Sequence, residues 1–317
     1  MEGEIYHKPA LLPETIDLLN INSSGTYVDA TFGGGGHSRA ILQALDLSGH
    51  LYGFDRDLDA LQNAPDDPRF TFVHSDYRYI PNFLTYYGVL PLPAENTIDE
   101  KQGADGILAD LGVSFHHFDN AERGFTFRED APLDMRMNRN GRLTAAEYIA
   151  NASDKQLETI FRTYTDLKHP AAIAKAITAA RTTQPVLTTG RLADVITPVL
   201  NPKTLKKDLS QAFQAIRITV NDELESLKAL LLNSLKVLKP GGRLAIITYH
   251  SIEDRLVKNF MRSGNLDGNV ERDFYGVATT PWKLITRSPV TPSAEEVELN
   301  PRSRSAKLRV AELSPKK

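Results

Sequence analysis

Cysteine is absent from the sequence. Its absence excludes a disulfide framework, a thiolate nucleophile and a cysteine-ligated metal site. Long hydrophobic runs are also missing, and no stretch reaches the apolar length of a membrane span. The first twelve residues lack the basic flank and the apolar run of a signal peptide. We therefore expect a cytoplasmic protein without membrane insertion, and no spacing of possible ligands predicts a metal site.

An excess of charge of either sign is missing too. The 317 residues include 37 Lys and Arg against 40 Asp and Glu, which gives a formal net charge of −3. A protein with this balance can bind nucleic acid only through local basic patches. Apolar residues are plentiful, at 41% of the chain, and can form the core of one large domain or two smaller ones.

Apolar runs of strand length alternate with helical patterns in the first third of the chain. Strands are expected at 25–31, 49–55, 70–73 and 105–110, and a helix is expected at 37–45. Strands that alternate with helices predict a parallel sheet with helices on both faces.

The alternation stops between residues 141 and 220, where every apolar pattern has helical spacing. Ser153 and Thr189 are the expected N-caps of two of these helices. The pattern predicts an all-helical insert in an α/β domain.

The alternation resumes after residue 220. Asn221 can cap a helix, residues 243–249 form an expected buried strand, and Ser251 can cap the next helix. Residues 263–305 are polar and carry loop signals, and residues 306–313 form the last expected strand.

Four consecutive glycines lie between a strand and a helix in "VDATFGGGGHSRAIL" (28–42). Glycine has no Cβ atom, so the main chain can approach a ligand closely. Ligands of open α/β sheets lie beyond the carboxyl ends of the strands, so we expect Gly33, Gly34, Gly35 and Gly36 to form the floor of a cofactor site. The alternative is a flexible turn.

Asp55 ends the second expected strand, about twenty residues after the glycines. A carboxylate at this position can bind both hydroxyls of an adenosine ribose. Asp110 ends the fourth expected strand, where it can bind the amino group of a cofactor or accept a hydrogen bond from an amine. For Asp55 the alternative is a helix cap or a surface turn, and for Asp110 it is an N-cap at the end of the strand.

These features do not distinguish a nicotinamide oxidoreductase from an S-adenosylmethionine enzyme, because both bind adenosine at such an edge. Ser38 occupies the third position of the G-x-G-x-x-G pattern, which disfavours the dinucleotide. The later segment "VLKPGGRLAII" (237–247) is similar to one common among methyltransferases. A non-catalytic RNA-binding assembly factor and a small-molecule or DNA amino-methyltransferase are further alternatives.

Eight segments, in order along the chain, resemble the motifs of the RsmH/MraW-type methyltransferases. They are "DATFGGGGHS", "GFDRD", "LADLGVS", "ERGFTF", "PLDMRM", "FQAIRITVNDEL", "VLKPGGRLAIITYHSIEDR" and "NPRSRSAKLR". The resemblance covers residue 7 to about residue 312. It implies a class I methyltransferase fold, which is Rossmann-like, doubly wound and mostly parallel, with an inserted all-helical domain.

The resemblance also implies an activity. The cofactor would be S-adenosylmethionine, and the target would be the exocyclic N4 amine of a cytosine in small-subunit (16S) ribosomal RNA. The expected partner is this RNA or the small ribosomal subunit, and the sequence leaves open a monomer or a homodimer. The cofactor domain is expected in residues 1–114 and 216–317, and an inserted RNA-recognition domain in residues 115–215.

Site residues follow from the resemblance, position by position. Those expected to bind the cofactor are Gly35, Gly36, His37, Asp55, Tyr77, Asp110 and His117, with Tyr77 stacked on adenine. His117 stands where the family usually has Gln, and it can form hydrogen bonds with a pH-dependent donor pattern.

Catalysis by direct attack of the amine on the methyl group is expected, because the chain has no thiolate to attack the pyrimidine ring. Asp110 is the first candidate to accept the proton of the amine. His250 and Tyr249, after the expected strand 243–249, are candidates to stack on the target base or to form hydrogen bonds to it. Asp254 is interpreted as a helix cap.

RNA contact needs cations and stacking groups. The candidates are Arg136, Arg139, Arg142, Lys203, Lys206, Lys207, Arg302, Arg304, Lys307 and Arg309. Phe125 and Phe127 are expected in a loop that covers the cleft. The alternative for the basic residues is a solvated surface.

Overall fold

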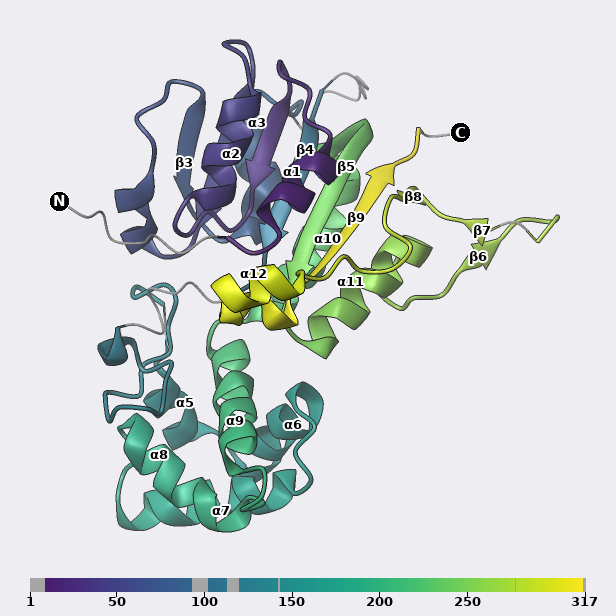
Figure 1. Ribbon diagram of the computed structural model, residues 1–317. Coiled ribbons are helices and arrows are strands. Elements are labelled where there is room, and N and C mark those ends of the chain that lie inside the picture. The colour runs from purple at the N-terminus through teal and green to yellow at the C-terminus, as the bar shows by residue number, and fades with distance from the viewer. Residues whose placement is uncertain (1–8, 93–101, 113–119, 142, 277, 316–317) are drawn as a thin grey trace. The chain divides into compact units, whose positions relative to one another are not determined.

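The computed structural model describes residues 9–92, 102–112, 120–141, 143–276 and 278–315 (Figure 1). The chain forms two compact units. We call them the sheet unit (Met1–Gly112 with Glu225–Lys317) and the helical unit (Val113–Leu224). Within the described ranges, no helix combines the length and the apolar character needed to cross a membrane.

The sheet unit contains a seven-stranded sheet in the order β3-β2-β1-β4-β5-β9-β8. The strands are β1 (Thr26–Asp29), β2 (His50–Asp55), β3 (Phe70–His74), β4 (Ala104–Asp110), β5 (Leu238–Thr248), β8 (Trp282–Leu284) and β9 (Lys307–Leu313). β1 pairs in parallel with β2 and β4, β2 with β3, and β4 with β5, whereas β9 is antiparallel to both of its neighbours. The expected mostly parallel sheet is confirmed.

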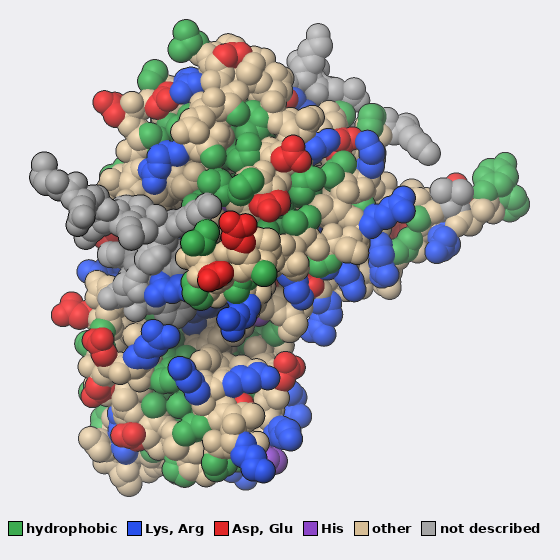
Figure 2. All heavy atoms as spheres, in the orientation of Figure 1, with side chains coloured by type: hydrophobic (Ala, Val, Ile, Leu, Met, Phe, Trp, Pro, Cys, Tyr) green, Lys and Arg blue, Asp and Glu red, His purple; other side chains and the backbone are tan. Residues whose placement is uncertain are grey.

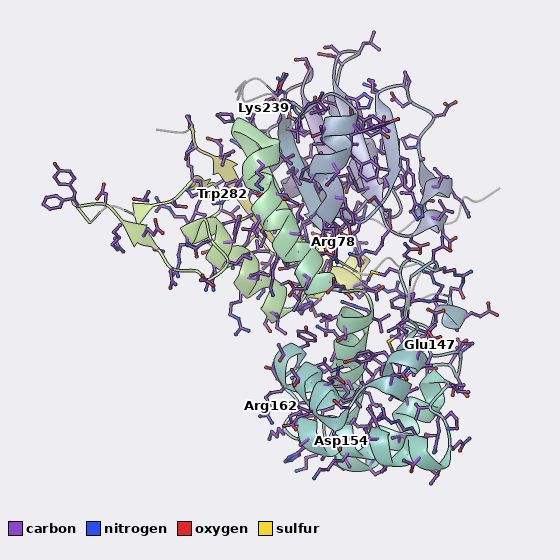
Figure 3. The ribbon with its side chains drawn as sticks, turned by 180° about the vertical axis from the view of Figure 1, so that it is seen from behind. Arg78, Glu147, Asp154, Arg162, Lys239 and Trp282 are labelled. Carbon is purple, nitrogen blue, oxygen red and sulfur yellow. The ribbon has the colours of Figure 1, made fainter. Side chains whose placement is uncertain are left out.

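Helices cover both faces of this sheet. α1 (Leu12–Leu19) and α2 (Gly36–Ala44) share a buried apolar cluster with one face of the strands. α10 (Glu223–Val237) and α3 (Ile80–Tyr86) cover the opposite face, which Figure 3 shows from behind. The doubly wound arrangement is therefore confirmed. Three 3-10 turns complete this unit: η1 (Leu58–Asn63), η2 (Tyr77–Tyr79) and η5 (Pro301–Ser305).

The segment expected to be loop, residues 263–305, contains regular elements as well. These are β6 (Glu271–Arg272), β7 (Ala278–Thr279), β8 and α12 (Ala294–Leu299). β8 pairs with β9, and α11 (Ser251–Ser263) precedes the segment. The loop signals did not indicate these short elements, because short strands depend on distant pairing partners, which local sequence does not report.

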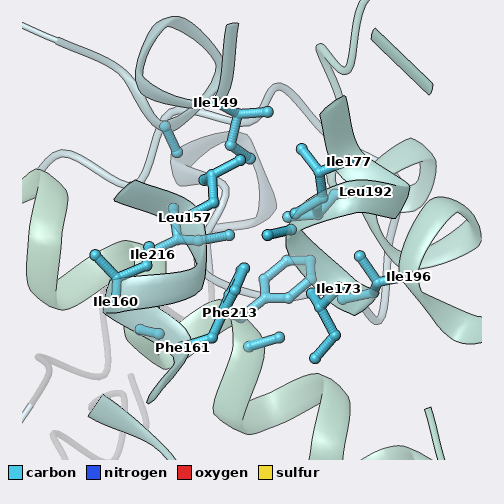
Figure 4. Close-up of a cluster of buried hydrophobic side chains, with 14 of the residues drawn as sticks. Ile149, Leu157, Ile160, Phe161, Ile173, Ile177, Leu192, Ile196, Phe213 and Ile216 are labelled. Carbon is cyan, nitrogen blue, oxygen red and sulfur yellow. The ribbon is translucent and has the colours of Figure 1, made fainter. Parts of the chain in front are cut away.

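The described residues of the helical unit form helices and 3-10 turns around one apolar core (Figure 4). The elements are η3 (Ala121–Arg123), α5 (Ala145–Asn151), α6 (Asp154–Tyr164), α7 (Pro170–Thr183), α8 (Thr189–Ile196), η4 (Thr197–Val199) and α9 (Leu205–Val220). Leu157 and Phe161 of α6, Ile173 of α7 and Phe213 of α9 point into this core. The predicted all-helical insert is confirmed.

One of the four expected helix caps is confirmed. Ser153 forms a capping box at the start of α6. Thr188 caps α8 in place of Thr189, whose hydroxyl bonds to the backbone of Ala131 and Glu129.

The other two expected caps, at Asn221 and Ser251, are wrong. Asn221 lies at the C-cap of α9, and its side chain bonds to the backbone of Met135 and Met137. His250, rather than Ser251, caps α11.

Candidate functional site

The carboxyl ends of the parallel strands β1, β2, β4 and β5 meet at one edge of the sheet, and the glycine loop follows β1 there. Two side chains hold Gly33 in this loop. Its N–H donates to Asp55 Oδ2 at 2.8 Å, and its carbonyl accepts from Asn63 Nδ2 at 3.0 Å. Gly33 and Gly35 have φ angles of +50° and +72°, a region that glycine reaches at little cost. The loop is therefore an ordered structure rather than a flexible turn.

The glycines differ in what surrounds them. A Cβ atom at Gly35 would lie 2.9 Å from Phe32 Cζ, and one at Gly36 would lie 2.8 Å from Pro9 Cγ. A Cβ atom at Gly33 would meet nothing nearer than the Thr31 carbonyl oxygen, at 3.8 Å. The chain's own packing therefore requires glycine at 35 and 36, whereas Gly33 leaves space beside the loop. The cofactor contacts of Gly35 and Gly36 stay predictions.

A buried carboxylate lies under the loop. Asp29 accepts hydrogen bonds from Ser38 Oγ at 2.7 Å and from the Thr31 N–H at 3.1 Å. Burial raises the pKa of Asp29, and the hydrogen bond from Ser38 opposes that rise. In the sequence Ser38 is only a departure from a glycine pattern, whereas in the structure its hydroxyl joins α2 to the end of β1.

His37 lies between this carboxylate and Asp110. Its Nε2 is 3.2 Å from the carbonyl oxygen of Ala10, and its Nδ1 is 3.9 Å from Asp110 Oδ2. Burial lowers the pKa of His37, so the ring is neutral at pH 7. A neutral ring that donates from Nε2 to the carbonyl leaves Nδ1 without a proton and facing Asp110.

Asp110 ends β4, and several groups fix its position. Its N–H donates to Thr31 Oγ1 at 2.6 Å, and its Oδ1 accepts from the Gly112 N–H at 3.3 Å. The Tyr249 hydroxyl, after β5, donates a hydrogen bond to the same carboxylate. Burial raises the pKa of Asp110 to about 6, against the lowering effect of the bonds from Tyr249 and Gly112. The carboxylate is therefore mostly ionised at pH 7 and accepts a proton below about pH 6.

Glu253 is a further buried carboxylate here, only 3% exposed, which sequence analysis did not select. Its Oε2 accepts from the Tyr249 N–H at 3.3 Å, and its Oε1 lies 2.9 Å from His250 Nε2. His250 Nδ1 in turn accepts from the Glu253 N–H at 3.5 Å. Acidic residues are common in the first turn of a helix, so its sequence position indicated no more than a favourable helix dipole.

Asp55 and Tyr77 flank the far side of the loop. The Asp55 carboxylate accepts two N–H groups, from Gly33 and Asp57, each at 2.8 Å. Tyr77 is 7% exposed, and the guanidinium carbon of Arg56 lies 5.5 Å from its ring centroid. Arg56 therefore covers one face of this ring, and stacking on adenine stays a prediction. His117 lies outside the described residues.

Several predicted RNA contacts are exposed. Arg139, Lys203, Lys206 and Lys207 are exposed in the helical unit. Figure 2 shows Lys and Arg side chains on one face of the molecule. Arg302 and Arg304 are exposed in η5 of the sheet unit. Arg136 instead forms an ion pair with Asp134, at 2.7 Å. Arg142 lies outside the described residues.

Other candidates have structural partners. Arg309 is 7% exposed and forms an ion pair with Asp254 at 2.7 Å, which Lys307 joins at 3.6 Å. Asp254 is thus an ion-pair partner rather than a cap, and burial makes the assignment of Arg309 to RNA wrong.

The two phenylalanines expected in a loop over the cleft are not exposed side chains. Phe125 is buried, and Phe127 packs edge-on against Phe213, with ring centroids 5.2 Å apart. The covering role of this loop stays a prediction. Among the described residues, no group of three or more His, Asp or Glu side chains is arranged to hold a metal ion.

Comparisons with known proteins agree on one family. Residues 4–314 match the model of the MraW methylase family. A ribosomal RNA small subunit methyltransferase H of Phocaeicola vulgatus is 52% identical over 309 residues, which cover 98% of both chains. Proteins of the same name from Parabacteroides distasonis and Bacteroides thetaiotaomicron are 51% and 50% identical, each covering 97% of both chains.

Proposed function

The chain belongs to the MraW methylase family, and from this premise we propose that it methylates the exocyclic N4 amine of a cytosine in small-subunit (16S) ribosomal RNA, with S-adenosylmethionine as the methyl donor. The observation that carries the proposal in this chain is Asp110. It is a carboxylate with a pKa of about 6, at the strand edge beside the glycine loop. The small ribosomal subunit or its RNA is the proposed partner, and the cytoplasm is the proposed location.

The residues at the edge fit a nucleoside cofactor. Gly33 leaves space beside the loop, and the N-terminal N–H groups of α2 lie next to it. Asp55 is already oriented by two N–H donors and can accept further hydrogen bonds from ribose hydroxyls. Tyr77 is the proposed adenine contact. When bound there, S-adenosylmethionine supplies an electrophilic methyl group on its sulfonium.

The amine of cytosine is a weak nucleophile because its lone pair is conjugated with the ring. Asp110 accepts a hydrogen bond from this amine, localises the lone pair on nitrogen, and takes up the proton on its carboxylate. A pKa near 6 suits this task at neutral pH. Tyr249 holds the carboxylate in place by donating to it, and Glu253 holds the backbone of Tyr249.

His37 is the proposed side chain that shares the proton taken up by Asp110. His37 Nδ1 lies 3.9 Å from Asp110 Oδ2 and carries no proton when Nε2 donates to Ala10. A small movement would bring these two atoms within hydrogen-bond distance. Because burial lowers the pKa of His37, the ring returns to its neutral form readily. His250 Nε2 lies beside Glu253 Oε1, so His250 orients the carboxylate of Glu253.

A cytosine must leave its stack to reach Asp110, so the proposed target is single-stranded or flipped. The exposed cations of the helical unit, Arg139, Lys203, Lys206 and Lys207, are the proposed phosphate contacts. Arg302 and Arg304 of η5 supply further positive charge in the sheet unit.

Transfer of a tritiated methyl group, followed by nucleoside analysis of the RNA, tests the proposal. We expect label on N4-methylcytidine from small-subunit particles or protein-free 16S RNA, and the substrate that accepts label faster identifies the assembly stage. Label on carbon 5 or on a ribose oxygen would refute the amine mechanism. Calorimetry that shows no binding of S-adenosylhomocysteine at millimolar concentration would refute the cofactor assignment.

A further inference from the structure

A two-stranded hairpin of β6 and β7 projects from the sheet unit beyond α11 and β8 (Figure 1). Phe274 and Tyr275 form its tip and are 98% and 86% exposed. Among the described residues, Phe274 is the most exposed large hydrophobic side chain. Nothing in the chemistry proposed at the strand edge uses this pair.

The tip is an ordered turn. The Tyr275 N–H donates to Asp273 Oδ1 at 2.9 Å, and the Gly276 N–H donates to the Asp273 carbonyl at 2.9 Å. Arg272 closes the turn through a hydrogen bond to the Gly276 carbonyl at 2.7 Å. The two rings meet edge to face, with centroids 5.6 Å apart and planes at 87°. The turn therefore presents both aromatic rings to solvent in a defined arrangement.

Charged residues of both signs lie near the rings, and Arg272 stands between Glu271 and Asp273. Residues 258–287 contain five Lys and Arg against three Asp and Glu, and Figure 2 shows Lys and Arg side chains along the arm that leads to the apolar tip. Arg262 and Arg272 direct hydrogen bonds to the main-chain carbonyls of Gly268 and Gly276. The arm therefore combines an excess of positive charge with two exposed aromatic rings.

The apolar area is small for a protein partner. Two aromatic side chains bury about 150–250 Å² each, whereas a stable protein interface buries about 1,200–2,000 Å². The apolar area of two aromatic rings is sufficient for unpaired nucleotides, because each base stacks on one ring and each phosphate pairs with a cation.

We propose that the hairpin is an RNA-binding arm, in which Phe274 and Tyr275 stack on unpaired nucleotides of the substrate RNA outside the catalytic site. Arg272 and Arg262 contact the adjoining phosphates. This inference rests on the proposed function for the identity of the RNA. Stacking is tolerant of base identity, so the arm adds affinity and leaves the choice of cytosine to the catalytic site.

Paired substitutions at the tip separate stacking from simple hydrophobic contact. Leucine at both positions keeps apolar surface and removes the aromatic faces, whereas tryptophan at both positions keeps the faces. The probe is a fluorescein-labelled single-stranded RNA of small-subunit sequence, measured by anisotropy. We expect the Phe274→Leu/Tyr275→Leu protein to bind about tenfold more weakly per stacked base. The Phe274→Trp/Tyr275→Trp protein should retain the wild-type affinity.

Activity provides a second readout. The leucine pair should raise KM for the RNA and leave kcat and S-adenosylhomocysteine affinity unchanged. Tyr86→Leu is the matched control, because Tyr86 is 81% exposed and also meets a neighbouring ring edge to face. This control should bind RNA with wild-type affinity.

Three results would overturn the inference. One is wild-type RNA affinity in the leucine pair. Another is loss of self-association in sedimentation, which would assign the tip to a second copy of the chain. The third is weaker binding to whole subunits with unchanged binding to protein-free RNA, which would assign it to a protein partner. If wild-type protein binds RNA through the tip but transfers no methyl group, the proposed function fails and the arm stands.

Discussion

The hydroxyl of Tyr249 donates a hydrogen bond to the carboxylate of Asp110. This bond joins the loop after β5 to the end of β4, and Gly112 makes room for it. A Cβ atom at Gly112 would lie 2.8 Å from the Tyr249 ring. The phenol stays protonated because burial and Asp110 raise the pKa of Tyr249 well above 10. The donor is therefore present throughout the physiological pH range.

Removal of this donor should shift the pH profile of methyl transfer. The wild-type rate is expected to fall about tenfold per pH unit below pH 6, as Asp110 takes up a proton. In Tyr249→Phe the pKa of Asp110 loses a lowering contribution, so the acid limb should move to higher pH by on the order of one unit. Single-turnover rates measured from about pH 5 to about pH 9 cover the titration of Asp110 and report this shift. An unshifted profile would mean that a different group controls the rate.

Asp110→Asn should separate activity from stability. We expect methyl transfer to fall by about 10²–10⁴-fold, the usual contribution of a general base. Burial raises the folded-state pKa of Asp110 from 3.8 to about 6. The ionised group therefore destabilises the fold above that pH, and this penalty disappears as the pH falls below the unfolded value.

The asparagine variant should thus be more stable than wild type by about 2 kcal/mol at pH 8, with no such difference near pH 4. Denaturant unfolding at the two pH values measures this. If the variant is less stable than wild type at both pH values, the ionised carboxylate of Asp110 does not destabilise the fold.

Asp55 should control cofactor affinity. In Asp55→Asn, one carboxylate oxygen is replaced by an amide nitrogen that cannot accept the Gly33 N–H or a ribose hydroxyl. We expect S-adenosylhomocysteine to bind about 10- to 100-fold more weakly in calorimetry. Asp66→Asn, at an exposed position of the same unit, should bind as wild type does. Equal affinity in both variants would remove Asp55 from the site.

Gly35→Ala should destabilise the protein through a collision within the chain. The new Cβ atom would lie 2.9 Å from the Phe32 ring at a φ of +72°, so we expect a loss of about 3 kcal/mol in the free energy of unfolding. Gly88 has a φ of +76° and no atom within 4 Å of such a Cβ. Gly88→Ala should therefore cost only about 1 kcal/mol. If both variants lose a similar free energy of unfolding, the loss at Gly35 comes from backbone strain and not from the contact with Phe32.

Arg309→Ala should affect stability rather than RNA binding. It removes the partner of Asp254 at 2.7 Å and leaves Lys307, at 3.6 Å, as the remaining cation beside this partly buried carboxylate. We expect a loss of about 1.5–3 kcal/mol in chemical unfolding. Arg304→Ala removes an exposed cation and should change stability by less than about 0.5 kcal/mol. An Arg309→Ala protein with wild-type stability and weaker RNA binding would support Arg309 as an RNA contact.

Local sequence patterns were sufficient for much of the fold. The parallel strands β1, β2 and β4 are largely buried, so they appear as short apolar runs between helical patterns. Ser153 and Gln156 are three residues apart and cap each other across one helical turn. Both kinds of signal lie within a few neighbouring residues, which is why they can be identified without coordinates.

Elements that depend on distant partners were missed. Three-residue β8 exists because β9 offers a hydrogen-bonding edge. Asn221 looked like a helix start, but its side chain binds the backbone at Met135 and Met137, and it ends α9 instead. A cap residue takes whichever backbone groups the fold brings near, and the sequence does not report which ones those are.

The amino-acid order alone determined which residues reach the carboxyl edge of the sheet, because the parallel strands all end there, the glycine loop follows β1, and Asp110 is the last residue of β4. Only the tertiary structure decided their chemistry. Burial raises the pKa of Asp110, a tyrosine from the next strand's end holds its carboxylate, and Glu253 holds that tyrosine's backbone. Desolvation and long-range hydrogen bonds depend on neighbours in space, and these are set only when the whole chain has folded.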